Sequence, residues 1–308
     1  MSLTKEITDE LTKRGFCVWR THENTVSCFD ILARRDAQIF VIKFYKFIEG
    51  ITKENAEEMK NLAVCLSAYL IVLAEASKNC PLNEDVLYSR YDIAVVTYET
   101  FKKILDEEYP LLYSTRGNYC AEIDREIFSE IKSALNLTLD DISKILNVSK
   151  QAVYRYETQC RIPQNVMEKF SGIFGKDIIK KVKISKGSRI QTTKKELYVS
   201  DKLSALGFLI WEGTAAFNIL AINRNENKTG TFNSTKEDKN FIIVSNDLRV
   251  LTRRADFVEE IMEIIPGICV CIGKYKPGKT LGKRAKFIRE NDLRSIETKE
   301  EFIEIVKG

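Results

Sequence analysis

Five polar side chains that can hydrogen-bond to nucleic acid lie close together near the middle of this 308-residue chain. They are Ser149, Lys150, Gln151, Tyr154 and Arg155. Lysine can donate to guanine O6 and N7, and glutamine can pair with adenine N6 and N7. Serine and arginine commonly bind phosphate oxygens. Residues of these types could recognise a DNA sequence, provided that a helix presents them on one face.

The sequence around these side chains predicts a helix-turn-helix, which needs two short helices that cross over a tight turn. Ser143 is the small residue where the helices touch, and Asn147 suits the left-handed backbone of the turn. Thr138 with Asp141 predicts a capping box for the first helix, and Ser149 is a good N-cap for the second. The residues at the apolar positions of the shared core are Ile142, Leu146, Val148, Val153 and Tyr156.

This pattern resembles the Cro/CI-type (XRE) helix-turn-helix family over roughly residues 122–184. Two positions depart from the family: Asn147 replaces the usual glycine, and Leu139 replaces a common phosphate-contacting glutamine. The residues that match the recognition helix S-x-x-x-[IV]-x-x-[WY]-E and the proline after it are Ser149, Val153, Tyr156, Glu157 and Pro163.

That resemblance implies that the second helix enters the major groove of double-stranded DNA with its first turns against the bases. Because such modules usually pair on two half-sites, it also implies a homodimer. A plain helical hairpin, or a module used for protein contacts, remains the alternative. The expected DNA contacts are Lys150, Gln151 and Tyr154 to bases, and Ser149, Arg155, Lys144 and Arg161 to phosphates.

The helix and strand signals in the sequence divide the chain into four segments. Residues 1–120 alternate helix and strand signals, 121–184 carry only helical signals, 185–195 form a basic polar linker, and 196–308 return to α/β patterning. The central segment predicts helices over 122–135, 138–146, 149–157, 164–173 and 176–182. The first segment predicts helices over 3–14, 52–67 and 98–108, and strands over 16–19, 28–35, 38–45, 68–76 and 92–96.

The last α/β segment shares identities with the first, which favours a duplication. Both tryptophans of the chain fall at matching places. In each segment an apolar strand, a helix and a buried strand follow, and we expect Thr52 and Thr252 to open the two helices. The parallel stretches are 11–19 with 203–211 and 29–33 with 217–221.

Asp30 and, on the following strand, Lys43 resemble the core motif of PD-(D/E)xK nucleases. In that family two acidic residues hold Mg²⁺, and the lysine helps to orient water for attack on a phosphodiester. The acidic position two before the lysine is Val41, and in the second copy Asn218 replaces Asp30. The expected fold class is therefore α/β (α+β), with two nuclease-like domains flanking an all-α helix-turn-helix domain, and no catalysis. A Mg²⁺-dependent DNA nuclease is the alternative function.

The whole arrangement resembles a group of archaeal HTH-type transcriptional regulators of similar length. This resemblance implies a sequence-specific, DNA-binding transcription regulator. A second alternative is a nucleotide-binding protein, because residues 273–280 fit the phosphate-binding expression GxxxxGK[ST] and place Gly278, Lys279 and Thr280 at the phosphates. The unusual lysines within that loop favour a basic loop or a solvated turn instead.

Charge, cysteine and hydropathy patterns narrow the function classes further. The net charge is only +4, but basic residues gather over 176–195 and 274–289, either as a phosphate footprint or as a solvated surface. The eight cysteines include no CxxC pair, and His22 is the one histidine, so we expect reduced thiols, no metal and no cofactor. No apolar run reaches 18 residues and no signal-peptide core begins the chain, so a cytoplasmic protein is expected.

Overall fold

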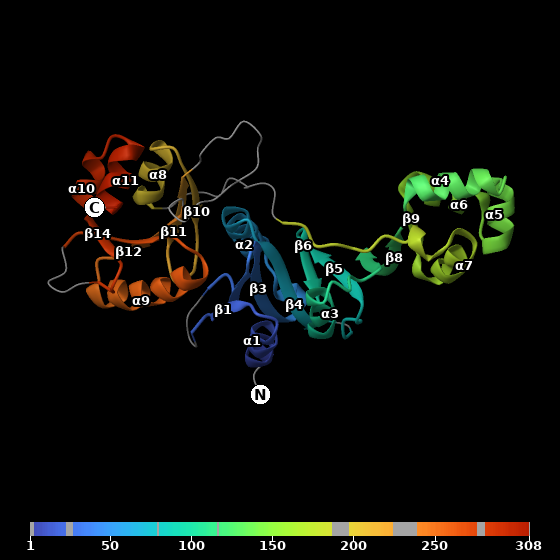
Figure 1. The fold of residues 1–308 in the computed structure, drawn as a ribbon, viewed down its shortest axis with the longest axis horizontal. Coiled ribbons are helices and arrows are strands. Elements are labelled where there is room, and N and C mark those ends of the chain that lie inside the picture. Colours follow the sequence, from blue (N-terminus) through green and yellow to red (C-terminus); the bar gives the residue numbers. More distant parts are fainter. Residues whose placement is uncertain are drawn as a thin grey trace. The chain divides into compact units, whose positions relative to one another are not determined.

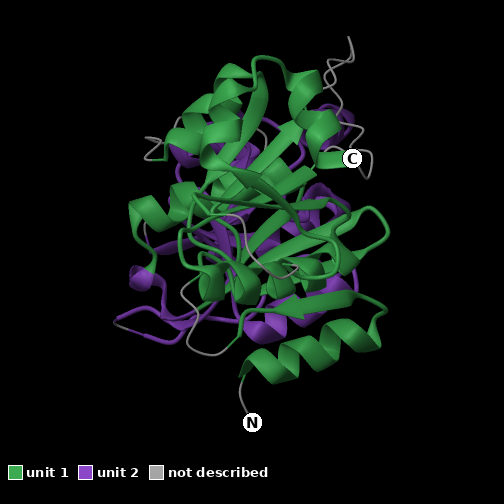
Figure 2. Cartoon of the chain, turned by 90° about the vertical axis from the view of Figure 1, so that its left-hand side faces the viewer, with its two compact units in different colours: residues 1–44, 51–71, 186–308 green, residues 45–50, 72–185 purple. Residues whose placement is uncertain are grey.

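Packing divides the chain into two compact units (Figure 2). Unit 1 comprises residues 1–44, 51–71 and 186–308, and unit 2 comprises residues 45–50 and 72–185. Unit 1 therefore joins the beginning of the chain to its last α/β segment, and unit 2 crosses the expected boundary at residue 120. The computed structural model describes residues 3–22, 27–78, 80–115, 117–186, 197–223, 239–275 and 281–307.

The N-terminal α/β segment contributes residues 3–44 and 51–71 to unit 1. Its strands β1, β2 and β3 pair antiparallel, with Ile31 opposite Ile42. Ile7 and Leu11 lie one helical turn apart on α1, and both are fully buried. Thr52 caps α2 as predicted. The elements are α1 (Leu3–Lys13), β1 (Cys17–Arg20), β2 (Ile31–Arg35), β3 (Gln38–Phe47), α2 (Lys53–Leu66) and β4 (Tyr69–Ala76).

The C-terminal α/β segment, residues 197–307, builds a five-stranded sheet in the order β10-β11-β12-β13-β14. The helices α8, α10 and α11 pack on one face of this sheet, and α9 lies on the other (Figure 1). The elements are α8 (Tyr198–Ala205), β10 (Phe208–Glu212), β11 (Ile219–Asn223), β12 (Lys239–Val244), α9 (Leu248–Ile264), β13 (Ile268–Gly273), β14 (Lys286–Arg289), α10 (Glu290–Ser295) and α11 (Lys299–Lys307).

The two α/β segments share element order and strand register. In each, a helix leads into an antiparallel three-stranded meander, and Ile219 faces Ile242 as Ile31 faces Ile42. The prediction that Thr252 opens the second helix is wrong, because Asp247 caps α9 with its side chain and Thr252 lies inside the helix. Aspartate is a stronger N-cap than threonine, and Asp247 stands five residues earlier.

Within unit 1 the two segments exchange tryptophan hydrogen bonds. Trp19 Nε1 of the N-terminal segment donates to Glu260 Oε2 of α9 at 3.0 Å. Trp211 Nε1 of the C-terminal segment donates to the backbone oxygen of Glu58 in α2, also at 3.0 Å. Both indole rings are buried. Each segment thus anchors its tryptophan on the long helix of the other.

Unit 2 contains the helical segment and a set of short strands. β5 pairs antiparallel with β6 and parallel with β7, and β7, β8 and β9 follow antiparallel. The helices α4 to α7 lie together (Figure 1) around buried phenylalanines. The elements are β5 (Val86–Arg90), β6 (Ile93–Val96), α3 (Tyr98–Leu105), β7 (Leu112–Thr115), β8 (Asn118–Glu122), α4 (Arg125–Ala134), α5 (Leu139–Leu146), α6 (Lys150–Gln159), β9 (Arg161–Pro163) and α7 (Gln164–Phe174).

Two expectations for the central segment are wrong. It is not wholly helical, because β9 pairs with β8 between α6 and α7. The predicted helix over 176–182 shrinks to a single 3-10 turn, Lys176–Ile178. Extended backbone follows that turn, since Lys180 N donates to Glu122 O and Val182 N donates to Pro110 O. These long-range backbone hydrogen bonds replace the helical ones.

Candidate nucleic-acid interface

The helices α5 and α6 are joined by a tight turn whose geometry follows the local sequence. Asn147 has left-handed backbone, with φ 55°, and ends α5. Thr138 and Asp141 form the predicted capping box, with Asp141 N 3.2 Å from Thr138 Oγ1 and Thr138 N 3.0 Å from Asp141 Oδ2. Ser149 Oγ accepts a hydrogen bond from Ala152 N and caps α6. The caps at both ends of the turn set where the two helices begin and end.

The apolar sides of α5 and α6 are buried in the core of unit 2. Ile142, Leu146 and Val153 are each no more than 2% exposed. Ser143 is also buried, and its hydroxyl donates to Asp140 O at 2.8 Å. Because the buried side fixes how α6 is rotated, its polar side is left facing outward.

Most of the predicted DNA contacts are exposed on that outward side of α5 and α6. Tyr154 is 58% exposed although it is aromatic. Arg161 does not join the others, because it lies half-buried on β9 opposite Glu122. Arg161 follows the C-terminal end of α6. That end lies about 14 Å along the helix axis from Lys150, at 1.5 Å per residue. The exposed members are Lys144, Ser149, Lys150, Gln151, Tyr154 and Arg155.

Asp140 links two of these cations, a role that sequence reasoning missed. Its Oδ2 lies 2.7 Å from Lys144 Nζ and its Oδ1 lies 2.9 Å from Lys150 Nζ. Hydrogen bonds from Lys144 and then Lys150 lower the pKa of the Asp140 carboxyl to about 2. The four-residue spacing from Asp140 to Lys144 on one helix was a readable signal. The contact between Asp140 and Lys150 crosses the turn, and no spacing in the sequence indicated it.

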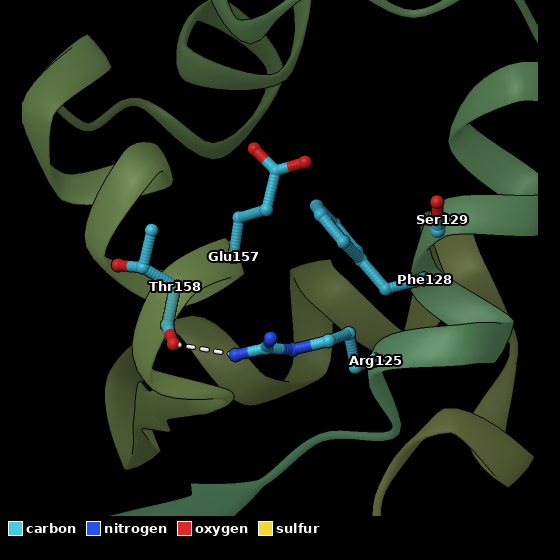
Figure 3. A pocket seen from close by; sticks show the side chains of 5 residues that line it. All are labelled: Arg125, Phe128, Ser129, Glu157 and Thr158. Carbon is cyan, nitrogen blue, oxygen red and sulfur yellow. Dashed lines mark hydrogen bonds between the residues drawn. The ribbon is translucent and has the colours of Figure 1, made fainter.

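A cavity of about 390 Å³ lies between α4 and the C-terminal half of α6 (Figure 3). Arg125 of α4 donates to Thr158 O at 2.7 Å, and Lys132 pairs with Glu157 at 2.8 Å. These bonds tie α6 to α4 at the end away from Lys150. The lining residues are Arg125, Phe128, Ser129, Glu157 and Thr158.

In the N-terminal α/β segment, Asp30 and Lys43 meet as the nuclease motif predicts. Lys43 Nζ lies 2.8 Å from Asp30 Oδ1 and also donates to Ser27 O at 2.8 Å. Asp30 Oδ2 accepts a hydrogen bond from Phe44 N at 2.8 Å. Both carboxylate oxygens of Asp30 are therefore occupied by protein donors. Val41, at the position of the second acid, is fully buried.

Glu58 on α2 is a second carboxylate near Lys43 that the sequence did not single out. Burial raises its pKa, and the Thr214 backbone N–H, the Thr214 and Cys28 side chains and Lys43 act against that rise. Glu58 Oε1 accepts a hydrogen bond from Thr214 N of the C-terminal segment. This carboxylate is thus engaged by the other half of unit 1.

The arrangement of the Asp30 and Glu58 carboxylates does not fit a Mg²⁺ site. Among the described residues, no group of three or more His, Cys, Asp or Glu side chains is arranged to hold a metal ion. Magnesium needs octahedral oxygen ligands, whereas the oxygens of Asp30 face a lysine and a backbone N–H.

The residues Gly278, Lys279 and Thr280 of the nucleotide-binding alternative, and nearly all of the expected linker, lie outside the described residues.

The described part of the chain holds no helix that is both long and apolar enough to cross a membrane.

Comparison with known proteins gives two kinds of similarity. Residues 1–110 match the family model of the PD-(D/E)XK superfamily domain. Over most of its length the chain is similar to archaeal proteins named "Putative HTH-type transcriptional regulatory protein". The Methanocaldococcus jannaschii relative is 25% identical over 294 residues, covering 92% of this chain and 89% of the relative.

Two further relatives carry the same name. The Archaeoglobus fulgidus protein is 26% identical over 309 residues, covering 99% of this chain and 97% of the relative. The Methanothermobacter thermautotrophicus protein is 36% identical over 154 residues, covering 50% of this chain and 49% of the relative. The chain is therefore a mixed α/β protein, nuclease-like at its beginning and similar throughout to proteins named as transcription regulators.

Proposed function

We propose that this protein is a sequence-specific DNA-binding transcription regulator that reads the major groove with α6. The observation that carries the proposal is the outward polar face of α6, held in place by a buried opposite face and capped at its first turn. A helix end exposed in this way can approach base edges. The names of the archaeal relatives support the same function.

The roles of individual residues follow from their position on α6. Lys150 and Gln151 lie in its first turn and Tyr154 one turn later, where a helix in the groove meets base edges. Ser149, Arg155 and Lys144 lie at its flanks and contact phosphates. Arg161, which lies half-buried on β9 beyond the end of α6, stays a predicted phosphate contact. The protein acts in the cytoplasm as a homodimer that spans two half-sites about 34 Å apart.

Selection from random-sequence duplexes tests this function. We expect wild-type protein to enrich a defined sequence, and the double variant K150A/Q151A to bind that duplex at least about fivefold more weakly, because one lost bidentate contact costs about 1–3 kcal/mol. The matched control is Q164A/K169A, which removes the same side-chain types from exposed positions on α7. Equal weakening by both double variants, or by neither, would reject the assignment of α6.

A second candidate function is DNA cleavage, favoured by the family-model match and by the Asp30–Lys43 ion pair. We propose that this chemistry is absent, because Val41 replaces the second acid and Glu58 bonds to Thr214. Incubation of linear, nicked and branched DNA with Mg²⁺ or Mn²⁺ tests this. Cleavage that D30A abolishes would establish the nuclease instead.

A further inference from the structure

We propose that Asp140 sets the sequence selectivity of α6, as a positioning residue whose carboxylate competes with DNA phosphates for Lys144 and Lys150. This inference rests on the proposed function, because it assigns a role within the same DNA-contacting face. It concerns a residue that makes no DNA contact of its own in that proposal.

The geometry places one carboxylate between two ammonium groups from two helices. Asp140 is the second residue of α5, and Lys150 is the first residue of α6. Each carboxylate oxygen meets one lysine, at 2.7 Å for Lys144 and 2.9 Å for Lys150. The lysine side chains are 72% and 64% exposed, against 38% for Asp140. The three charges therefore lie at the surface, on the side where DNA would approach.

Helix capping alone does not account for this arrangement. Asp141, not Asp140, makes the capping box at the start of α5. A carboxylate in the first turn of a helix and a lysine four residues later stabilise that helix modestly, and the Lys144 pair supplies this. The second pair, with Lys150, crosses the turn to the helix that reads the bases. It adds nothing to the capping of α6, which Ser149 provides.

The chemical consequence differs between random and preferred DNA. Phosphate contacts by lysine supply most of the affinity for any sequence. A carboxylate that occupies both lysines lowers this non-specific affinity, because a phosphate must compete with it. An ammonium group has three N–H donors, so Lys150 held by Asp140 keeps two for a base edge. The held side chain also loses less rotamer freedom when it makes that base contact.

The experiment compares D140N with wild type on two duplexes, the sequence that wild type enriches and a scrambled duplex of the same composition. We expect D140N to bind the scrambled duplex about threefold to tenfold more tightly. The slope of log K against log salt should steepen by about 0.9 for each additional phosphate that the freed lysines neutralise. Affinity for the enriched duplex should rise less, so the ratio of the two affinities falls.

Three further variants separate positioning from net charge. E130Q removes one negative charge from an exposed position on α4 and should change the scrambled-duplex affinity less than D140N does. D140E, which can still reach both lysines, should restore wild-type selectivity. In a K144Q/K150Q background, D140N should lose its effect, since a double-mutant cycle reports only interacting groups.

Equal effects of D140N and E130Q, or an effect of D140N that survives in K144Q/K150Q, would overturn the role of Asp140. Those outcomes leave the proposed function intact if K150A/Q151A still weakens binding to the enriched duplex. If K150A/Q151A has no effect, the proposed function itself fails. Thermal unfolding of each variant identifies any loss of fold, which would not steepen a salt slope.

Discussion

Asp30 and Asn218 accept equivalent backbone hydrogen bonds in the two α/β segments. Asp30 Oδ2 binds Phe44 N at 2.8 Å, and Asn218 Oδ1 binds Val244 N at 3.0 Å. Each residue also donates its own N–H to the strand opposite, to Ile42 or Ile242. Each side chain also meets a cation, but from a different element, because Arg254 of α9 reaches Asn218 where Lys43 of β3 reaches Asp30. The shared role of this position is to brace the start of a strand.

The variant D30N tests this bracing role. The amide can still accept from Phe44 N, as Asn218 accepts from Val244 N, but it no longer neutralises Lys43. We expect a folded protein whose free energy of unfolding falls by about 2 kcal/mol, the scale for a hydrogen bond to a charged group. Urea unfolding measures this. A loss below about 0.5 kcal/mol would show that the ion pair does not stabilise the fold.

Gly213 allows the C-terminal segment to approach α2 of the N-terminal segment. A Cβ there would lie 2.5 Å from the ring of Trp211 and would also meet the Glu58 side chain. We expect G213A to lower the free energy of unfolding by about 1–3 kcal/mol through overpacking. The control is G172A on α7, where a Cβ meets nothing within 4 Å. That change should stabilise by up to about 1 kcal/mol, and destabilisation of both variants alike would contradict the close approach.

The raised pKa of Glu58 predicts a pH dependence with a definite sign. Burial is the main cause of the rise, so the folded state binds a proton at Glu58 more tightly than the unfolded state does. This contribution to stability is present below the unfolded pKa and is lost as pH rises through the folded pKa. Relative to E58Q, wild type should therefore lose free energy of unfolding as pH rises above about 4, where the unfolded carboxyl titrates. A flat difference over this rise in pH would contradict it.

Local signals explain why the helical module was predicted so closely. The caps Thr138 and Ser149 and the left-handed Asn147 act within one turn of the chain, so residue type alone indicates their geometry. The structure confirms the ends of α5 and α6 to within two residues.

Features that depend on distant partners were not readable. The segment after residue 178 has an ordinary helical pattern, but it runs extended because Glu122 and Pro110 offer backbone acceptors. The hydrogen bond from Trp19 to Glu260 joins residues 241 positions apart. The ion pair between Asp140 and Lys150 depends on how the turn sets α5 against α6. Each of these follows from tertiary packing, which spacing along the chain does not encode.

The most direct measurement of the central claim is a second selection from random duplexes, carried out with K150A/Q151A in place of wild type. If α6 reads bases in the major groove, the enriched sequences should lose their preference at the one or two base pairs that these side chains contact, and keep it elsewhere in the site. Recovery of the unchanged wild-type sequence by this variant would contradict base recognition by α6.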